Sequence, residues 1–481
     1  MTMGHNFIGG EWVAGARSVR NINPSDTRDV IGEYALADAA QARAAVDAAS
    51  AAFPAWSLSG PQQRFDVLDK AGSEILARSA ELGDLLAREE GKTLPEAVGE
   101  VVRAGQIFKF FAGEALRQRG ELLASVRPGI SVEVTREPLG VVSLITPWNF
   151  PIAIPAWKIA PALAFGNCVV FKPAELVPGS AWALAEILSR SGLPAGVFNL
   201  VMGSGAEIGP ALVDDPRVAG LSFTGSVATG RRLAETCAAR GAKHQLEMGG
   251  KNPLIVLDDA DLPVAVNCAV MGSFYSTGQR CTASSRLIVT AGIHDRFVDA
   301  MVERLKQLKV DDARRPGTDI GPVVDERQLA VDLDYIRIAK EEGATLAFGG
   351  EHRASNDLGQ PGHYLTPALF TDTDNAMRIS REEVFGPVAN VIRARDYDEA
   401  LALANDTPFG LSSGLCTTSL KHATHFKRHA QAGMVMVNAP TAGVDYHVPF
   451  GGRKGSSVGP REQGSHAAEF FTTVKTAYTA A

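Results

Sequence analysis

The stretch Cys168-Val169-Val170-Phe171-Lys172-Pro173-Ala174-Glu175 is a short apolar run that ends in a charged turn containing a proline. A helical pattern follows at 180–191, and another apolar run lies at 197–201. Similar runs occur at 140–146 and 220–223. Repetition of strand, turn and helix is the pattern of a parallel sheet, whose ligands bind at the carboxyl ends of the strands. The sequence therefore predicts an α/β fold with a ligand site after these runs.

A second alternation predicts another α/β domain, which contains Cys281. It consists of apolar runs at 253–257, 286–289 and 388–391 and a helical pattern at 294–308. We expect the boundary near Gly249 and Gly250, because adjacent glycines permit the backbone angles of a hinge.

Two further patterns precede and follow residue 121. Residues 38–55 and 62–90 carry apolar side chains at helical spacing, which predicts amphipathic helices. Residues 131–140 alternate and then turn, which predicts an antiparallel strand.

Composition excludes several classes of protein. The chain has 481 residues, 45% hydrophobic and 21% charged, which is typical of a globular enzyme of two or three domains. A net charge of −7 argues against nucleic-acid binding, and an anionic substrate would need a local cationic site. No apolar run reaches the roughly 20 residues of a membrane span, and residues 1–10 lack the pattern of a signal peptide. We expect a cytoplasmic protein without membrane contacts.

The five cysteines are few, odd in number and unclustered, which indicates a reducing compartment and neither a disulfide framework nor a metal site. Cys281 differs from the others because it follows Gly278-Gln279-Arg280 and precedes small polar residues, where a thiol could face a ligand. A lone cysteine is more often a buried small hydrophobe than a nucleophile.

Other motifs accompany Cys281 along the chain. They are Pro147-Trp148-Asn149-Phe150-Pro151, Phe223-Thr224-Gly225-Ser226, Leu246-Glu247-Met248-Gly249-Gly250-Lys251-Asn252-Pro253, Glu382-Glu383-Val384-Phe385-Gly386-Pro387 and Pro449-Phe450-Gly451-Gly452. Their order and spacing, including the 34 residues from Glu247 to Cys281, resemble the NAD(P)-dependent aldehyde dehydrogenase superfamily.

The resemblance implies an arrangement of three domains. A Rossmann-like cofactor domain would comprise residues 1–121 and 141–249, and an α/β catalytic domain would comprise 250–455. A small β bridging domain would comprise 122–140 and 456–481 and would pair subunits into a homodimer or homotetramer. The tail at 467–478 is apolar and β-rich enough to supply an added strand.

The resemblance also implies a reaction. Cys281 would attack the aldehyde, and the oxyanion formed would be stabilised by the Asn149 side-chain amide and the Cys281 N–H. Hydride loss would leave a thioester, and Glu247 would act as the general base that activates water. Branches that pass the acyl group to coenzyme A lack a glutamate here, so Glu247 favours release of the free acid.

The expected cofactor is NAD, with NADP possible. The strand end and helix start at 223–230 would meet the pyrophosphate. By resemblance, the cofactor-binding residues are Trp148, Lys172, Glu175, Gly225, Ser226, Glu383 and Phe385. A second glycine segment, Gly203-Ser204-Gly205 with Gly209, is a weak match to the dinucleotide fingerprint, and we interpret it as structural.

Within the superfamily the chain resembles the branch that oxidises α-ketoglutarate semialdehyde (2,5-dioxopentanoate) to 2-oxoglutarate. Succinate or glutarate semialdehyde, or a broad range of aldehydes, is the alternative. The candidate substrate residues are Arg280, Phe150, Trp157 and Phe450. Arg280 is not general in the family: it could hold a substrate carboxylate, lower the thiol pKa or form a structural salt bridge.

Two observations bear on other interpretations. A cysteine hydrolase needs a histidine base, and no histidine lies in a motif beside Cys281 or Asn149. A non-catalytic protein on this scaffold would not need Cys281, Glu247 and Asn149 together. One departure from the family is Ser457, where glycine usually follows Lys-x-Ser.

Overall fold

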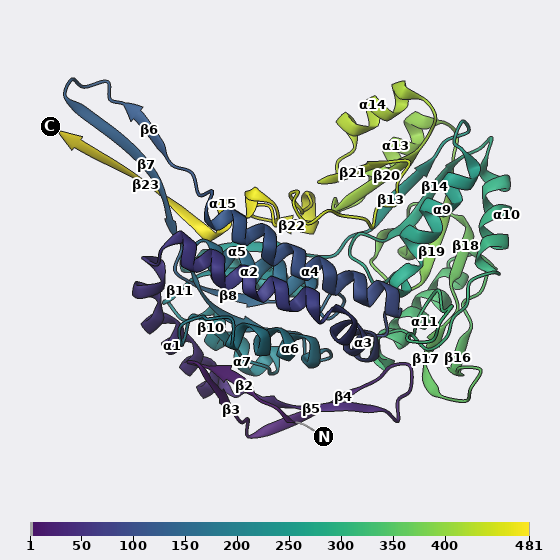
Figure 1. Ribbon diagram of the computed structural model, residues 1–481. Coiled ribbons are helices and arrows are strands. Elements are labelled where there is room, and N and C mark those ends of the chain that lie inside the picture. Colours follow the sequence, from purple (N-terminus) through teal and green to yellow (C-terminus); the bar gives the residue numbers. More distant parts are fainter. Residues whose placement is uncertain (1–2, 481) are drawn as a thin grey trace.

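Two large sheets organise residues 3–480, which are the residues that the computed structural model describes (Figure 1). The first sheet has eight strands in the order β22-β12-β11-β8-β9-β10-β2-β3. Their bounds are Ser457–Val458 (β22), Lys243–Glu247 (β12), Val218–Thr224 (β11), Val141–Ile145 (β8), Cys168–Lys172 (β9), Phe198–Leu200 (β10), Asn6–Ile8 (β2) and Glu11–Val13 (β3). The five strands from β12 to β10 are parallel, which confirms the α/β pattern predicted around residue 168.

Helices lie on both faces of this sheet, so its central strands are buried on both sides (Figure 1). The helices of this lobe are α1 (Ala39–Ser57), α2 (Pro61–Ala77), α3 (Ser79–Glu90), α4 (Leu94–Ala115), α5 (Ala153–Ala164), α6 (Pro178–Ser189), α7 (Gly205–Val213) and α8 (Val227–Ala239). The segment 62–90 is divided at Arg78, whose backbone leaves the helical region (φ −100°, ψ 16°). Helix α5 is apolar on nearly all sides, and all its residues are buried.

The second sheet has seven strands in the order β15-β18-β19-β14-β13-β20-β21. Their bounds are Thr345–Phe348 (β15), Ala368–Thr373 (β18), Val388–Ala394 (β19), Ser284–Thr290 (β14), Asn252–Val256 (β13), Ser412–Cys416 (β20) and Met434–Val437 (β21). The helices are α9 (Leu262–Ser273), α10 (His294–Leu305), α11 (Glu326–Glu341), α12 (Arg378–Arg381), α13 (Tyr397–Asn405) and α14 (Leu420–His429). The predicted runs became β13, β14 and β19, and α10 buries Phe297, Met301 and Leu305 along one stripe.

Two smaller sheets lie at the surface. The N-terminal sheet has the order β1-β5-β4, and β16 pairs with β17. Their bounds are Met3–Gly4 (β1), Val30–Leu36 (β5), Arg17–Ile22 (β4), His352–Ser355 (β16) and Pro361–Leu365 (β17). The hydroxyl of Tyr364 on β17 donates a 2.6 Å hydrogen bond to the Ser25 carbonyl, which ties the two lobes together.

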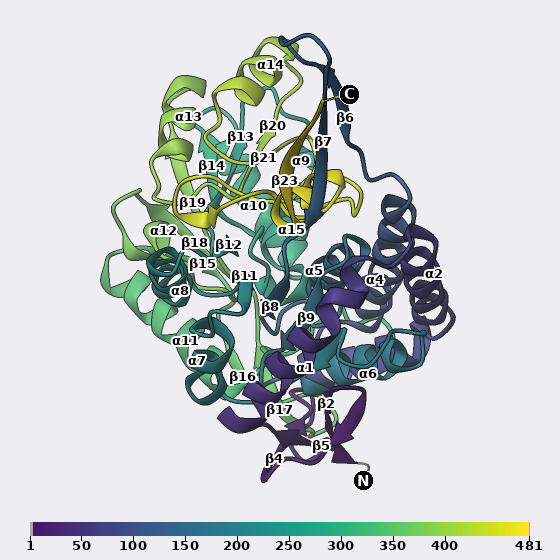
Figure 2. The ribbon, with the colours of Figure 1, turned by 90° about the vertical axis from the view of Figure 1, so that its left-hand side faces the viewer.

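A three-stranded arm projects from the first lobe. It consists of β6 (Glu121–Ala124), β7 (Ile130–Pro138) and β23 (Thr472–Ala480), and Figures 1 and 2 both place β23 beside β7. The antiparallel strand predicted at 131–140 and the added tail strand are therefore confirmed.

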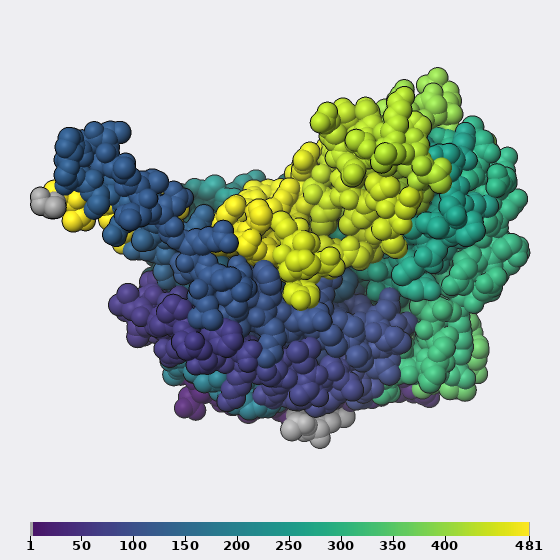
Figure 3. Space-filling view, turned by 45° about the horizontal axis from the view of Figure 1, so that its top comes forward, coloured from purple at the N-terminus to yellow at the C-terminus, as the bar shows by residue number. Residues whose placement is uncertain are grey.

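The domain division stays a prediction, with one difference at its C-terminal boundary. Residues 456–471 were expected in the bridging domain, but β22 pairs with β12 in the first sheet. Phe470 and Phe471, in α15 (Ala468–Phe471), are buried in the core of the first lobe because their rings need apolar contacts that the thin arm lacks. Figure 3 shows this C-terminal segment in yellow between the blue and green halves of the molecule.

Among the described residues, we find no helix with the length and hydropathy that crossing a bilayer requires.

Candidate active site

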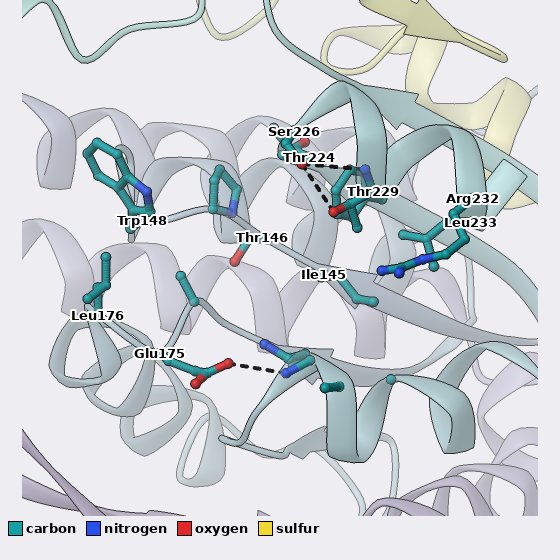
Figure 4. Close-up of a pocket in the computed structure, with 18 of the residues that line it drawn as sticks. Ile145, Thr146, Trp148, Glu175, Leu176, Thr224, Ser226, Thr229, Arg232 and Leu233 are labelled. Carbon is teal, nitrogen blue, oxygen red and sulfur yellow. Dashed lines mark hydrogen bonds between the residues drawn. The ribbon is translucent and has the colours of Figure 1, made fainter. Parts of the chain in front are cut away.

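A cavity of about 1130 Å³ lies at the carboxyl ends of β8, β9 and β11, where the parallel sheet predicts a ligand (Figure 4). Its lining includes five of the seven residues expected to bind the cofactor, namely Trp148, Lys172, Glu175, Gly225 and Ser226.

Helix α8 begins at the wall of this cavity. Ser226 caps it, accepting a hydrogen bond from the Thr229 N–H at 3.4 Å, so the positive end of the helix meets the cavity. Gly225 precedes the cap, and a Cβ there would lie 2.6 Å from the Phe223 ring. The Thr224 hydroxyl oxygen is buried and has no partner among the described residues. Free donors at a helix start fit a dinucleotide phosphate and its ribose.

The opposite wall carries a charged pair. Glu175 accepts a 3.1 Å hydrogen bond from the Gly205 N–H, and burial lowers the pKa of Lys172 although Glu175 opposes this. Gly205 and Gly209 also line the cavity. The second glycine segment thus starts α7, as expected of a structural turn, and in addition forms part of the cavity wall.

Cys281 lies between η1 (Tyr275–Gly278) and β14, and it is the only cysteine in residues 3–480 that is not fully buried. It packs against the cluster of Leu411, Met434 and Phe450. Burial raises the pKa of its thiol to about 12, and the nearby carboxylates of Glu383 and Glu247 add to the effect. Arg280 and the thiol interact electrostatically, but burial and the two carboxylates decide the direction of the shift, so the role of Arg280 stays a prediction.

Asn149 is held next to the segment that carries Cys281. Its side-chain amide donates a 3.0 Å hydrogen bond to the Gln279 carbonyl, and it is 3% exposed. Its carbonyl accepts a 2.8 Å hydrogen bond from Lys92, which also bonds Glu100 at 2.7 Å. Glu100 in turn accepts the Ile152 N–H at 3.1 Å. These contacts fix the Asn149 loop to α4.

Glu247 ends β12 and is 2% exposed. Burial, and next the neighbouring Glu462, hold the pKa of its carboxyl well above the usual range, although Ser457 and Lys158 oppose this. Ser457 donates a 2.5 Å hydrogen bond to Oε2 of Glu247. In this conformation burial therefore disfavours the ionised form of Glu247, which is the form that can act as a base.

Glu383 and Phe385 lie outside the cavity lining but adjoin it. Glu383 accepts a 2.8 Å hydrogen bond from the Gly250 N–H, and burial raises the pKa of its carboxyl to about 7. Phe385 has φ 66° and meets the Trp148 ring edge-on at 5.3 Å. Glu383 approaches Gly249 so closely that a Cβ there would lie 2.0 Å from its Oε2.

The four candidate substrate residues are divided between two places. Trp157 and Phe450 pack together with ring centroids 5.4 Å apart, beside Cys281. The Phe150 ring instead lies 3.9 Å from Lys92 Nζ, and Arg280 donates a 2.5 Å hydrogen bond to the Met271 carbonyl on α9. The roles of these side chains stay predictions.

Residues 12–477 match the Aldehyde dehydrogenase family. The chain belongs to that family. Its reaction is the NAD(P)-dependent oxidation of aldehydes, so the chain is an aldehyde-oxidising oxidoreductase.

The relatives of this aldehyde dehydrogenase are named after aldehydes of different charge. It is 43% identical over 475 residues to the alpha-ketoglutaric semialdehyde dehydrogenase of Bacillus subtilis (strain 168), which covers 98% of this chain and 97% of the relative. It is also 43% identical over 448 residues to the betaine aldehyde dehydrogenase of Cereibacter sphaeroides (strain ATCC 17029 / ATH 2.4.9), covering 93% of this chain and 88% of the relative. The crystal structure of betaine aldehyde dehydrogenase from Staphylococcus aureus in complex with NAD+ matches with a TM-score of 0.96 at 34% identity, over 99% of this chain and 95% of that one.

Sequence reasoning missed several charged residues that this aldehyde dehydrogenase places at its site. They are Lys92, Glu100, Arg103 and the buried pair Lys158 and Glu462. Spacing could have found Glu100 and Arg103. Together with Glu96 they recur at i, i+4 and i+7 on a helix that is otherwise apolar on that face. No local pattern distinguishes Lys92 or Glu462.

Proposed function

We propose that this aldehyde dehydrogenase oxidises α-ketoglutarate semialdehyde to 2-oxoglutarate with NAD+ as the preferred acceptor. The observation that carries the proposal is that Cys281, Asn149 and Glu247 converge beside a cavity whose helix start and free hydroxyls fit a dinucleotide. The semialdehyde is supported by the similarity to the Bacillus subtilis enzyme.

In the proposed first step, the sulfur of Cys281 forms a bond to the aldehyde carbon and the carbonyl π electrons move to oxygen. The Asn149 amide keeps one N–H beyond its bond to Gln279, and this N–H would face the oxyanion together with the Cys281 N–H. A donor of this kind contributes about 3 kcal/mol in the transition state. The thiol gives its proton to water before the C–S bond forms, because only the thiolate is an effective nucleophile.

NAD+ when bound supplies the acceptor for the hydride that leaves the tetrahedral carbon. Trp148, Lys172, Glu175, Gly225 and Ser226 would hold it in the cavity, and Glu383 and Phe385 would complete the nicotinamide end. The cysteine then carries a thioester. Glu247 would take a proton from water as its oxygen attacks the acyl carbon, and the C–S bond breaks to release the acid and Cys281.

Reduced-nicotinamide absorbance with a panel of aldehydes tests the proposal. The wild type should turn over α-ketoglutarate semialdehyde with a higher kcat/KM than succinate semialdehyde, glutarate semialdehyde, betaine aldehyde or pentanal, and 2-oxoglutarate should form in equal amount to the reduced cofactor. A preference for betaine aldehyde or pentanal would contradict the substrate. A Cys281→Ser variant should produce no reduced cofactor with any of them.

We also propose that the arm pairs two copies of the chain. Apolar side chains gather on it, with Leu122 75%, Val474 60% and Tyr478 61% exposed. Outward apolar residues on a thin projecting sheet are typical of a surface that a partner covers. Light scattering should give a dimer or tetramer for the full chain and a monomer for a chain ending at Phe471. An unchanged mass for the shortened chain would contradict this role of the arm.

A further inference from the structure

One face of α4 is directed at the active site through three charged residues. Glu96 accepts hydrogen bonds from the Ser276 N–H and hydroxyl at 2.9 Å, and Glu100 holds the Asn149 loop through Lys92. Arg103 follows on the same face, one turn further along the helix.

Arg103 differs from its two neighbours because its charge has no ion-pair partner among the described residues. Its Nε and Nη2 atoms are buried and donate no hydrogen bond to any acceptor in residues 3–480. These two atoms form one edge of the planar guanidinium, which is the edge that binds a carboxylate through two parallel hydrogen bonds. Leaving a buried donor unsatisfied costs about 1–3 kcal/mol. A ligand carboxylate that accepts hydrogen bonds from these two donors would remove that cost.

The surroundings of Arg103 place this edge near the nucleophile. Its guanidinium carbon lies 5.9 Å from the centroid of the Trp157 ring, and Trp157 packs on Phe450, which is in the cluster that contacts Cys281. Burial lowers the pKa of Arg103, and the charges of Glu100, Asp445 and Cys281 oppose this, so the thiol lies within electrostatic reach of the guanidinium. Trp157 Nε1 is also buried without a partner in the described part of the chain.

We propose that Arg103 binds the carboxylate of the anionic aldehyde, with the Trp157 indole N–H as a further donor, while the aldehyde end of the same molecule meets Cys281. This inference rests on the proposed function, since it assigns the recognition of the carboxylate that distinguishes the semialdehyde. It supplies the local cationic site that an acidic protein needs for an anionic substrate.

Arg280, the candidate from the sequence, is less suited to this role. Its Nη2 atom already donates to the Met271 carbonyl, which occupies one of the two atoms of its carboxylate-binding edge. The carboxylate that acts most on its pKa is Glu96, on the α4 turn that precedes Glu100. Arg280 therefore anchors the Cys281 loop to α9.

The charge of Arg103 also distinguishes between the anionic and the cationic aldehydes after which the relatives are named. A guanidinium without a counter-ion repels a quaternary ammonium group and attracts a carboxylate. We therefore infer that this family member selects against betaine aldehyde.

The test compares Arg103→Met with Arg280→Met on two substrates of five carbons, α-ketoglutarate semialdehyde and neutral pentanal. Arg103→Met should raise KM for the semialdehyde about 10- to 100-fold, the value of one charge-assisted hydrogen bond or bidentate pair. Its kcat/KM for pentanal should stay at the wild-type value. Arg280→Met, the matched control, should change both substrates alike.

Inhibition by the product provides a readout that does not depend on turnover of the semialdehyde. With pentanal as substrate, 2-oxoglutarate should inhibit the wild type competitively, and Arg103→Met should weaken that inhibition by a similar factor. Arg103→Lys keeps the charge and should recover part of the inhibition by 2-oxoglutarate. If Arg103→Met melts at a lower temperature than the wild type, Arg103→Lys replaces it in the comparison.

The results distinguish this inference from the proposed function. A wild type that does not prefer the semialdehyde over pentanal overturns both. A wild type with that preference whose Arg103→Met variant loses equally on both substrates overturns the Arg103 assignment alone. A selective loss in Arg280→Met instead would assign the carboxylate to Arg280.

Discussion

The hydroxyl of Ser457 donates a 2.5 Å hydrogen bond to Oε2 of Glu247, and the two residues are also register partners where β22 pairs with β12. The same hydroxyl accepts the Gly452 N–H at 2.6 Å, so Ser457 ties the carboxyl to the loop that follows Phe450. Glycine, which the family resemblance leads us to expect at this position, has no hydroxyl and could not make this contact. The contact favours the ionised form of a carboxyl whose pKa burial raises.

Ser457→Ala should therefore shift the pH dependence of kcat. Loss of the hydrogen bond raises the pKa of Glu247 further, so the ionised base appears only at higher pH. We expect the acidic limb of the kcat profile to move up by about one pH unit. Ser457 has extended backbone angles (φ −147°, ψ 147°) that alanine adopts without strain. An unchanged limb would show that Glu247 leaves Ser457 before it acts.

Glu247→Gln should separate the two halves of the reaction. Glutamine keeps the size of the side chain but cannot accept a proton, so the hydride step should proceed while release of the acid slows. Rapid mixing should show a burst of reduced cofactor close to one per active site, followed by slow turnover. Loss of the burst itself would assign Glu247 to thiol activation.

Lys92→Met should destabilise the fold strongly. The Lys92 and Glu100 side chains are 1% and 2% exposed, and removing the lysine leaves the Glu100 carboxylate buried without its partner. Breaking such a pair costs about 3–5 kcal/mol, which should appear as a lower Tm. The matched control is Lys306→Met, which breaks an exposed pair with Glu303 of the same 2.7 Å length and should cost less than about 1 kcal/mol. Similar Tm values for the two variants would contradict this prediction.

Glu175→Ala should relax the preference for NAD+ over NADP+. Two unit charges about 4 Å apart repel by about 4 kcal/mol at an effective dielectric of about 20, which is an upper value because Lys172 offsets part of it. The ratio of kcat/KM values for the two cofactors measures the effect. Glu207→Ala, on α7 but outside the cavity lining, is the control and should leave the ratio unchanged. A wild type that prefers NADP+ would reverse the assignment of Glu175.

The parallel strands were predictable because each is a short apolar run with its own turn. Residues 168–171 and 253–257 show this, since strands buried on both faces need no alternation. The pairing of Ser457 with Glu247 was not predictable, because β22 has only two residues and its position depends on a contact across 210 residues. The division of 62–90 at Arg78 was likewise missed, because arginine is a good helix former.

For the site, motifs located Cys281, Asn149 and Glu247, but not what surrounds them. The sequence places Arg280 next to the nucleophile and Arg103 178 residues before it, yet the structure directs Arg280 to Met271 and Arg103 toward Trp157. Adjacency in the chain does not set the direction of a side chain. The packing of α4 against α5 brings Arg103 to Trp157 on α5.

The first sheet takes its two edges from opposite ends of the chain, with β3 at Glu11–Val13 and β22 at Ser457–Val458. During synthesis, the edge of β12 therefore waits more than two hundred residues for its neighbour, with its backbone donors and acceptors unpaired. Pairing over such a separation is slow, and an open edge of this kind recruits other chains until it is covered. Glu247 lies at the end of that open strand, so its hydrogen bond to Ser457 can form only after residue 457 has been synthesised. Translation thus completes the catalytic half of this lobe last, and a chain arrested after the second sheet would be both inactive and prone to aggregate.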